Sequence, residues 1–360
     1  MDPDWTSTSK YAPGFRIEID GSELDPEAAY SILSLRVEQE LKKTNAFNFQ
    51  VQDEFIEGRF KWLESGLFQV ASPVAVALGY AGDLVQVLRG KIQNINATFN
   101  TGQAPMFDVE GADTAYELLT TPSDTVVFRD KRDSDIVKEI VARIARTAPL
   151  SADVDPTEPV TAAKTKQGGK SFLEFLEGLA GENHYKLSLA GNRLYFKRES
   201  YAVTVAKLAW GRDLIRFEPQ LNTTSAVTEV VVRAWDPSSK RQIEGRARVG
   251  DETGQESGKR TASEMAQRLF GDVVKVITDR AVRSAAEAKR IARAALEEAS
   301  GSLVKATIEI VGNPELIPGT CVDIEGFGSL FSGKYYIVKA THTIGNDGYR
   351  SSLEVKRNTV

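Results

Sequence analysis

The alternation of apolar and polar residues in many short segments is the feature that most constrains the fold of this chain. Successive side chains of a β-strand point to opposite faces, so alternation with period two is typical of a strand with one buried face. Six such segments in the first third of the chain predict a small antiparallel barrel or sandwich. They are residues 15–21, 30–41, 46–53, 73–80, 84–99 and 106–113, with a hairpin turn at 100–102 and a short helix at 60–65.

Beyond residue 113 the pattern changes to that of helices alternating with short strands. Residues 149–169 are rich in Pro, Thr, Ala and Asp, which is typical of a loop. Ser171 and Glu174 then match a capping box, in which each side chain accepts a backbone N–H of the other residue at a helix start. We therefore expect helices from about 135 and from 171, followed by strands at 185–189 and 193–198 around a turn at Gly191-Asn192.

Strand patterns return in the last part of the chain, with a helical excursion between them. A polar, Gly-rich loop at 251–261 precedes two further capping boxes, one at Thr261 and Glu264 and one at Ser284 and Glu287. The predicted strands are 205–210, 214–221, 227–236, 241–249, 304–312, 321–326, 334–344 and 349–357.

These patterns predict an α+β chain that is mainly β. We expect two small antiparallel β-barrels with an inserted α+β domain and a helical excursion. The predicted parts are a first β-barrel domain at 1–113, the inserted domain at 114–203, the first strands of the second barrel at 204–250, the polar loop and helical excursion at 251–302, and the remaining strands of the second barrel at 303–360.

The two strand-rich regions echo each other. In each, a strand ends at Gly followed by an aromatic residue, a short excursion ends at Gly-Lys, and a long strand, a turn and a return strand follow. Because four features recur in the same order, we favour a structural duplicate over chance similarity. The paired positions are Gly79-Tyr80 with Gly326-Phe327, and Gly90-Lys91 with Gly333-Lys334.

Composition excludes several classes of protein. The net charge is −5, with 45 Lys and Arg against 50 Asp and Glu, which argues against a non-specific nucleic-acid binder. Cys321 is the only cysteine, so no intramolecular disulfide can form, and a reducing or redox-indifferent compartment is expected. The polar, acidic start lacks the pattern of a signal peptide, and no apolar run approaches the roughly 20 residues of a membrane span. We therefore expect a chain that folds in a cytoplasm.

Residues that usually carry catalysis or metal binding are scarce. His184 and His342 are the only histidines, and with Cys321 they show no metal-binding spacing, so a structural role is expected for each. The GGKS at 168–171 lacks the earlier glycine of a P-loop, and the GQESG at 254–258 is not a nucleophile elbow. Two strand tryptophans, Trp210 and Trp235, are expected to be core or interface anchors. No catalytic, cofactor-binding or metal-binding residue is predicted.

The run 318–357 carries the most specific motif of the chain. It reads Pro-Gly-Thr, Gly-x-Gly, Phe-Ser-Gly-Lys-Tyr-Tyr, a histidine, Gly-Tyr and a final strand. With it the chain resembles, over nearly its whole length, the phage late control protein D family, the tail baseplate hub proteins of contractile phages, R-type bacteriocins and contractile injection systems. Further matching stretches are 73–92, in which Leu88 replaces the usual Phe, and 133–140, 171–180 and 210–219.

The resemblance implies a trimer with two small barrels in each subunit. Six barrel units would form a ring similar to one hexameric layer of a tail tube, since heterologous contacts close into rings when the rotation fits. Such a hub is a symmetry adapter and conduit between the inner tube protein above and the trimeric spike below. The chain ends at Val360, just after the last predicted strand, so the spike is expected to be a separate polypeptide.

The resemblance also implies other baseplate proteins as partners, with a tape-measure protein as a further candidate, and no specific nucleic-acid binding. Assembly is expected in a bacterial cytoplasm, followed by incorporation into a virion tail or injection particle. The resemblance and the echo together predict ten turn or interface residues of the barrels. They are Gly79, Tyr80, Gly90, Lys91, Gly326, Phe327, Gly333, Lys334, Tyr335 and His342.

Two other functions stay open as alternatives. One is a tail-associated cell-wall hydrolase, although no catalytic pocket sequence is visible, and the other is a glycan- or receptor-binding module. For a hub, the acidic balance predicts an acidic or neutral lumen that does not retain cargo. The loops 150–169 and 250–260 are candidate contacts to other baseplate proteins, and an ordinary solvated loop is an equal alternative for each.

Overall fold

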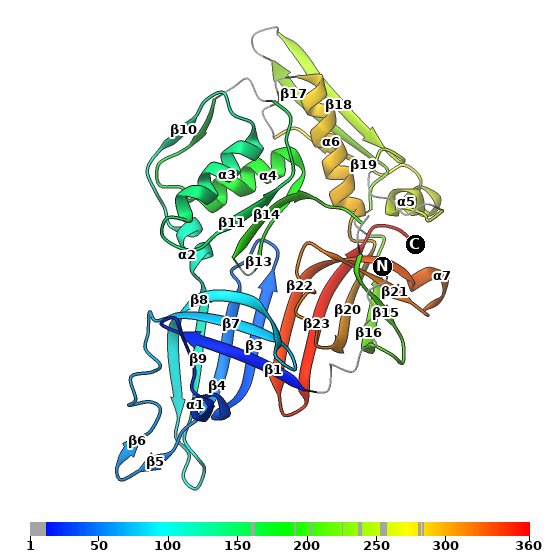
Figure 1. Cartoon of the computed structure of the whole chain (residues 1–360). Coiled ribbons are helices and arrows are strands. Elements are labelled where there is room, and N and C mark those ends of the chain that lie inside the picture. Colours follow the sequence, from blue (N-terminus) through cyan, green and yellow to red (C-terminus); the bar gives the residue numbers. More distant parts are fainter. Residues whose placement is uncertain are drawn as a thin grey trace. The chain divides into compact units, whose positions relative to one another are not determined.

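The structure is a computed structural model (Figure 1) that describes residues 12–159, 163–190, 192–201, 204–224, 226–236, 240–252, 258–279, 282 and 284–360. Several predicted features lie wholly or partly outside the described residues: the chain start, Gly191 of the predicted turn, residues 160–162 of the first candidate contact loop, and residues 253–257, which include most of GQESG and of the second loop. The chain divides into two compact units, which we describe separately.

Unit 1 comprises the described residues of Met1–Arg198, with Glu309–Gly319 and Val338–Leu353. Its main sheet is antiparallel, with hydrogen-bonded neighbours in the order β22-β3-β4-β9-β8-β7-β1-β2. These strands are β1 (Pro13–Ile19), β2 (Ser22–Glu23), β3 (Ile32–Glu40), β4 (Ala46–Gln52), β7 (Pro73–Tyr80), β8 (Asp83–Thr98), β9 (Met106–Asp113) and the later part of β22 (Gly333–Gly345).

The apolar residues of the predicted alternation face the core of this sheet. Phe47, Phe49 and Phe107 are buried, and the ring centroids of Phe49 and Phe107 lie 5.8 and 5.4 Å from that of Phe68. Aromatic pairs at these separations add stability beyond their buried area. The same part of the chain contains a short helix, α1 (Pro26–Tyr30), and a separate small hairpin of β5 (Phe55–Ile56) and β6 (Arg59–Phe60).

The helix predicted at 60–65 is not present, and turns follow β6 instead. The carboxylate of Asp53 accepts the backbone N–H groups of Glu54, Trp62 and Leu63 at 2.8, 2.8 and 3.0 Å. These hydrogen bonds satisfy the buried Asp53 carboxylate and tie the turns to the residue that follows β4.

The inserted α+β part of unit 1 has its own apolar core, in which Leu176, Ile140 and Phe196 are fully buried. Its helix α4 begins with the predicted capping box of Ser171 and Glu174. Two short strands lie in the segment 149–169 that we expected to be a loop, because β11 pairs with β14 in parallel and β12 pairs with β10. The elements are α2 (Thr114–Thr120), β10 (Val126–Phe128), α3 (Asp133–Ile144), β11 (Ser151–Val154), β12 (Lys164–Lys166), α4 (Phe172–Asn183), β13 (Tyr185–Ala190) and β14 (Arg193–Arg198).

Unit 2 comprises the described residues of Glu199–Ile308, Thr320–Ile337 and Glu354–Val360. In its barrel strands, β15 runs parallel to β21 and β21 pairs antiparallel with β22. The strands are β15 (Thr204–Ala209), β16 (Leu214–Leu221), β20 (Val304–Val311), β21 (Cys321–Glu325), the first part of β22 and the end of β23 (Gly348–Arg357), with the short helix α7 (Gly328–Phe331) after β21. The rest of β20 and β23 belongs to unit 1.

A separate three-stranded sheet in unit 2 has the order β18-β17-β19. Its strands β17 (Glu229–Asp236) and β18 (Arg241–Arg248) are the ones we expected at the start of the second barrel, and β19 (Val274–Ile277) joins them in parallel to β17. The excursion also contains α5 (Ala262–Phe270), which has the predicted capping box of Thr261 and Glu264, and α6 (Ala285–Ser300), in which Ser284 accepts the backbone N–H of Glu287.

Helix α6 lies along this sheet in Figure 1, and small residues allow the close packing. Ala288 and Ala292 are fully buried, and Leu296 completes the stripe. A Cβ atom on Gly245 of β18 would overlap with the backbone of Ala288 and Lys289. The helix can therefore approach the strand only where no side chain intervenes.

The structure confirms the expected class, a mainly β chain with few helices. The predicted domain bounds stay a prediction.

We predict opposite effects for the same substitution at two glycines. Gly245→Ala should lower the free energy of unfolding by about 1–3 kcal/mol, because the methyl group overpacks the contact with α6. Gly178→Ala in α4 should raise it by up to about 1 kcal/mol, because that position is exposed, has open space and lies within a helix. Urea unfolding of the full chain measures both. Equal effects of the two substitutions would contradict the close contact with α6.

Candidate functional site

The ten predicted positions divide equally between the two units. Unit 1 contains Gly79, Tyr80, Gly90, Lys91 and His342, and unit 2 contains Gly326, Phe327, Gly333, Lys334 and Tyr335. We therefore describe the surroundings of each group within its own unit.

In unit 1 the two predicted glycines allow backbones to approach. A Cβ atom on Gly79 would overlap with the carbonyl oxygen of Asp83, and one on Gly90 with that of Ala112. Ala81 and Gly82 both have positive φ, which makes the tight turn between β7 and β8. The excursion predicted between Gly79 and Gly90 is therefore the first half of a strand, since β8 starts at Asp83 and pairs with β7 along its length.

In unit 2 the corresponding glycines supply backbone conformation. Gly326 has φ of 93° and Gly333 has φ of 134°, values that other residues rarely adopt. Between them a true excursion is present, formed by α7. The echo thus rests on glycines with two different physical roles, and an evolutionary duplication stays a prediction.

His342 lies in a buried polar network of unit 1. Its Nδ1 atom lies 2.9 Å from Ser351 Oγ and 3.0 Å from the hydroxyl of Tyr349. The Tyr80 hydroxyl donates to the Gly312 carbonyl at 3.0 Å, and the rings of Tyr80 and Tyr349 are 5.6 Å apart. Burial lowers the pKa of His342 to about 4 and raises that of Tyr80 to about 12, so both are neutral at pH 7.

This network contains the residue types of a hydrolase but not the access that catalysis needs. His342 and Ser351 have no exposed surface, so no substrate can reach them in this conformation. The hydrogen bonds instead satisfy polar groups that would be costly to bury without partners. His342 is therefore a core residue of unit 1, whereas the sequence led us to assign it to a turn or an interface.

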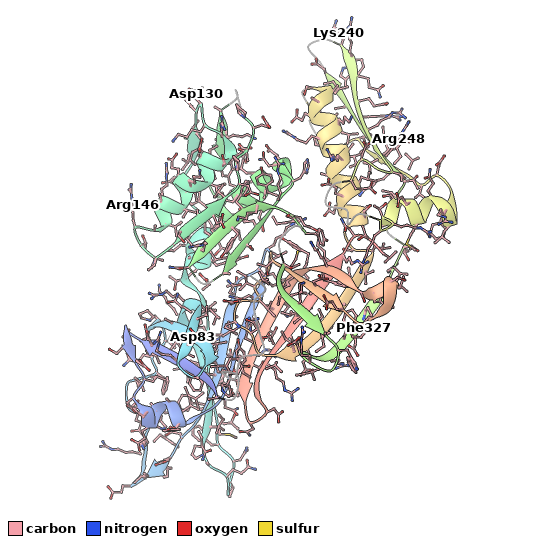
Figure 2. All side chains as sticks on the ribbon, turned by 45° about the vertical axis from the view of Figure 1, so that its right-hand side comes forward. Asp83, Asp130, Arg146, Lys240, Arg248 and Phe327 are labelled. Carbon is pink, nitrogen blue, oxygen red and sulfur yellow. The ribbon has the colours of Figure 1, made fainter. Side chains whose placement is uncertain are left out.

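Phe327 and Tyr335 belong to an aromatic group in unit 2. Phe217 joins them, with ring centroids 4.6 Å from Phe327 and 5.9 Å from Tyr335. Tyr335 is fully buried, and the guanidinium of Arg357 lies over its ring at 5.5 Å. Phe327, labelled in Figure 2, is half-buried and also contacts Trp210 edge-on at 5.9 Å.

The two strand tryptophans are on the surface. Trp210 is 63% exposed and Trp235 is 64% exposed, so the core role is wrong for both. A role as interface anchors stays a prediction.

A pocket in unit 1 contains two of the predicted positions. Its volume is about 430 Å³, and its lining includes Gly90, Lys91, Arg89 and Glu18 from the barrel and Asp113 from the start of the insertion. The Asp113 carboxylate caps α2 by accepting the backbone N–H groups of Ala115 and Tyr116. Burial nevertheless raises the pKa of Asp113 to about 6, because the charged form is poorly solvated there.

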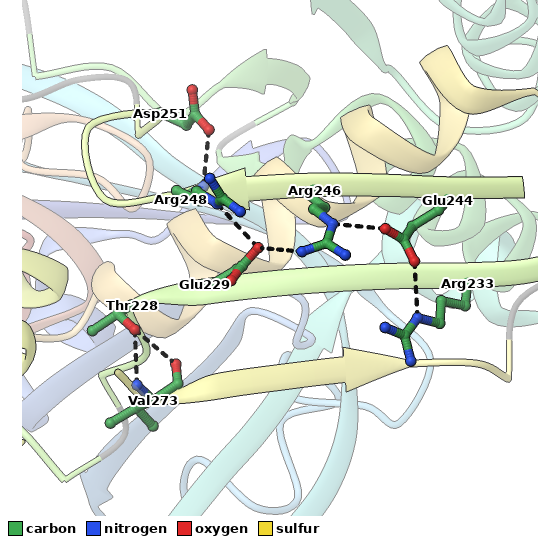
Figure 3. A network of polar contacts seen from close by, with 8 residues as sticks. All are labelled: Thr228, Glu229, Arg233, Glu244, Arg246, Arg248, Asp251 and Val273. Atoms are coloured by element: carbon green, nitrogen blue, oxygen red, sulfur yellow. Dashed lines mark hydrogen bonds and ion pairs between the residues drawn. The ribbon is translucent and has the colours of Figure 1, made fainter. Parts of the chain in front are cut away.

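Sequence reasoning did not identify a ladder of charged side chains on β17 and β18, shown in Figure 3. Glu244 accepts from Arg233 at 3.0 Å and from Arg246 at 2.6 Å, and these bonds lower the pKa of Glu244. Glu229 in turn accepts from Arg246 at 3.3 Å and from Arg248 at 3.1 Å. The alternation of Arg and Glu at every second position of two neighbouring strands was the signal that could have revealed it.

No group of three or more His, Cys, Asp or Glu side chains that could hold a metal ion occurs among the described residues. The part of the chain that the structure describes also has no helix long and apolar enough to cross a membrane.

Comparisons with known proteins identify a family and a fold. Residues 9–346 match the model of the family described as Alg8 N-terminal domain, so the chain belongs to that family. This matching model differs from the late control protein D family, to which the motifs of the sequence show a resemblance. No curated protein matches the sequence.

Solved structures of tail proteins share the fold. A tail protein from Neisseria meningitidis is 14% identical with a TM-score of 0.71, and the match covers 96% of this chain and 97% of the other. A prophage tail protein from Shewanella oneidensis is also 14% identical with a TM-score of 0.71, covering 96% and 98%. An Escherichia coli component of the type VI secretion system is 12% identical with a TM-score of 0.53, covering 95% and 76%.

We predict that His342 makes unit 1 less stable in acid. Its pKa is about 4 in the folded chain and about 6.5 when unfolded, so the unfolded state binds the extra proton. Stability from this residue is present above pH 6.5 and is lost as the pH falls towards 4, by about 3 kcal/mol. His342→Gln should remove this part of the pH dependence, as measured by urea unfolding between pH 7 and pH 4.

His184→Asn is the matched control, because His184 is partly exposed and ends α4 in the left-handed conformation that asparagine tolerates. This variant should keep the pH dependence of the wild type. If His342→Gln and the wild type lost the same stability on acidification, the buried neutral imidazole would be refuted.

Proposed function

We propose that the chain is a structural hub in the baseplate of a contractile tail or injection system, similar to the late control protein D proteins. In this proposal three copies form a ring that joins the hexameric inner tube to a separate trimeric spike, and the ring acts as symmetry adapter and conduit. The observation that carries the proposal is the likeness to tail proteins over 96% of this chain and 97% of the other.

Two further features support a tail protein. The E. coli relative in fold is a type VI secretion component whose description notes structural similarity to T4 bacteriophage tail proteins. The motif at 318–357 points to the same class, since it resembles the hub proteins of contractile particles. The proposed partners are two further copies, the tube, the spike, other baseplate proteins and a tape-measure protein, in a particle assembled in a bacterial cytoplasm.

We also propose that the chain is not an enzyme. The only histidines are His342, which is buried without access, and His184, which ends a helix. A Ser-His-Asp mechanism needs a histidine beside an accessible serine. The described residues provide no such pair.

The mass of the assembled particle tests the hub directly. The full chain, expressed together with a tube protein and a spike protein from the same source, should yield a complex with this chain in multiples of three. Native mass spectrometry gives the stoichiometry, and cryo-electron microscopy gives the position of the chain. A single copy per particle, or a position away from the tube–spike junction, would refute the hub.

We expect the purified chain to leave peptidoglycan intact, measured as release of soluble fragments, because the described residues contain no accessible histidine beside a serine. Hydrolysis that is lost on heating would support the cell-wall hydrolase instead. Binding of the isolated chain to glycans, without assembly on the tube, would support the receptor-binding module.

A further inference from the structure

The two edges of the small sheet in unit 2 differ in chemistry. The sheet has the order β18-β17-β19, so β18 and β19 are its edge strands. β18 carries Glu244, Arg246 and Arg248 on its open face, and all three are bound into the charged ladder. In Figure 3 this ladder lies over β17 and β18, whereas the contacts drawn to the β19 side are those between Thr228 and Val273, at 2.8–3.1 Å.

The β19 edge is apolar and open. Val274 and Val276 lie on one face, and each is 49% exposed. Leu269 and Phe270, at the end of the preceding helix α5, are also exposed, each to 61%. No described strand pairs with the outer edge of β19.

An edge of this kind favours strand pairing with another chain. Proteins protect free edges with charged side chains, which is the arrangement on β18, because unpaired backbone N–H and C=O groups accept any extended segment. β19 carries one charge, Lys275, and strand alternation places it on the face opposite to Val274 and Val276. Pairing along this edge would satisfy backbone groups and bury apolar surface together.

We propose that β19 pairs antiparallel with β19 of a second copy of this chain. Opposite residues of antiparallel strands share a face, so a twofold axis can pass through Val276 or Lys275. The axis at Lys275 would place two like charges opposite each other, which is unfavourable. The axis at Val276 instead places Val276 opposite Val276, Val274 opposite Thr278 and Lys275 opposite Ile277, with no like charges paired.

We favour a second copy of this chain as the partner of the β19 edge, because two identical edges match each other in an antiparallel pair. It has the same length, the same apolar face and a register free of charge conflict. A twofold contact of this kind is also the commonest closed arrangement of identical chains. The apolar strip is short, so the pairing belongs to the class of weak, concentration-dependent contacts.

The pairing does not depend on the hub function. A ring of three copies uses threefold contacts, whereas the β19 contact joins copies in twos. If both the trimeric hub and the β19 contact are correct, the isolated chain forms hexamers that dissociate into trimers. If the chain is not a trimeric hub, it forms dimers that dissociate into monomers.

A substitution on the proposed axis tests the contact. Val276→Lys would place two lysines opposite each other and remove apolar surface, so the dissociation constant of the doubled species should rise roughly tenfold or more. Sedimentation equilibrium of the full chain over a wide concentration range measures it. The wild type should show a species twice the mass of the one that predominates in the variant.

Gln242→Lys is the matched control, because it adds the same charge to the exposed face of the β18 edge. It should associate like the wild type. Hydrogen exchange gives a second measurement on the unmodified chain, in which the amides of 274–277 should exchange more slowly at high protein concentration. The pairing is overturned if the wild type and Val276→Lys have the same mass at every concentration, if Gln242→Lys dissociates equally, or if exchange does not depend on concentration.

Discussion

Strand β22 is the element on which both units depend. Its first residues pair with β21 in unit 2, where Tyr336 is opposite Cys321, and its later residues pair with β3 in unit 1, where His342 is opposite Val37. Both faces of the strand are largely buried, including Tyr335, Ile337 and Ala340. A single continuous strand of 13 residues therefore supplies buried side chains to each unit.

Much of the fold could be predicted because one physical signal, the period of burial, operates locally. Strands such as β7 and β9 fall within a residue of their predicted bounds, and the capping boxes at Ser171 and Thr261 mark real helix starts. The predictions of helices and strands failed where residues distant in the sequence determine the local structure. The segment 60–65 forms turns in place of the predicted helix, and the Asp53 carboxylate that accepts the N–H groups of Trp62 and Leu63 lies outside a sequence window around 60–65. Short strands such as β11 and β12 depend on pairing with segments farther along or back in the chain.

The candidate positions were predictable as special but not in their roles. The Gly-aromatic and Gly-Lys pairs of the echo all contain glycines with a constrained backbone, yet at Gly79 and Gly90 the constraint is close approach, and at Gly326 and Gly333 it is a positive φ. Sequence cannot distinguish these cases, because both select against a side chain. Tyr335 and His342 were assigned to turns or interfaces, and their complete burial shows that they pack inside their own units. The sequence did not reveal the charged ladder, because its five side chains form ion pairs only when β17 and β18 lie side by side.

The pKa values of Asp113 and His342 have a joint consequence for folding. Unit 1 takes up a proton at Asp113 when it folds between about pH 4 and pH 6, since burial raises the pKa of that carboxyl from 3.8 to about 6. Over nearly the same range it releases a proton from His342, whose pKa falls from 6.5 to about 4. The two exchanges have opposite signs and similar size. Asp113 and His342 therefore offset each other's contribution to the pH dependence of the stability of unit 1 in mild acid.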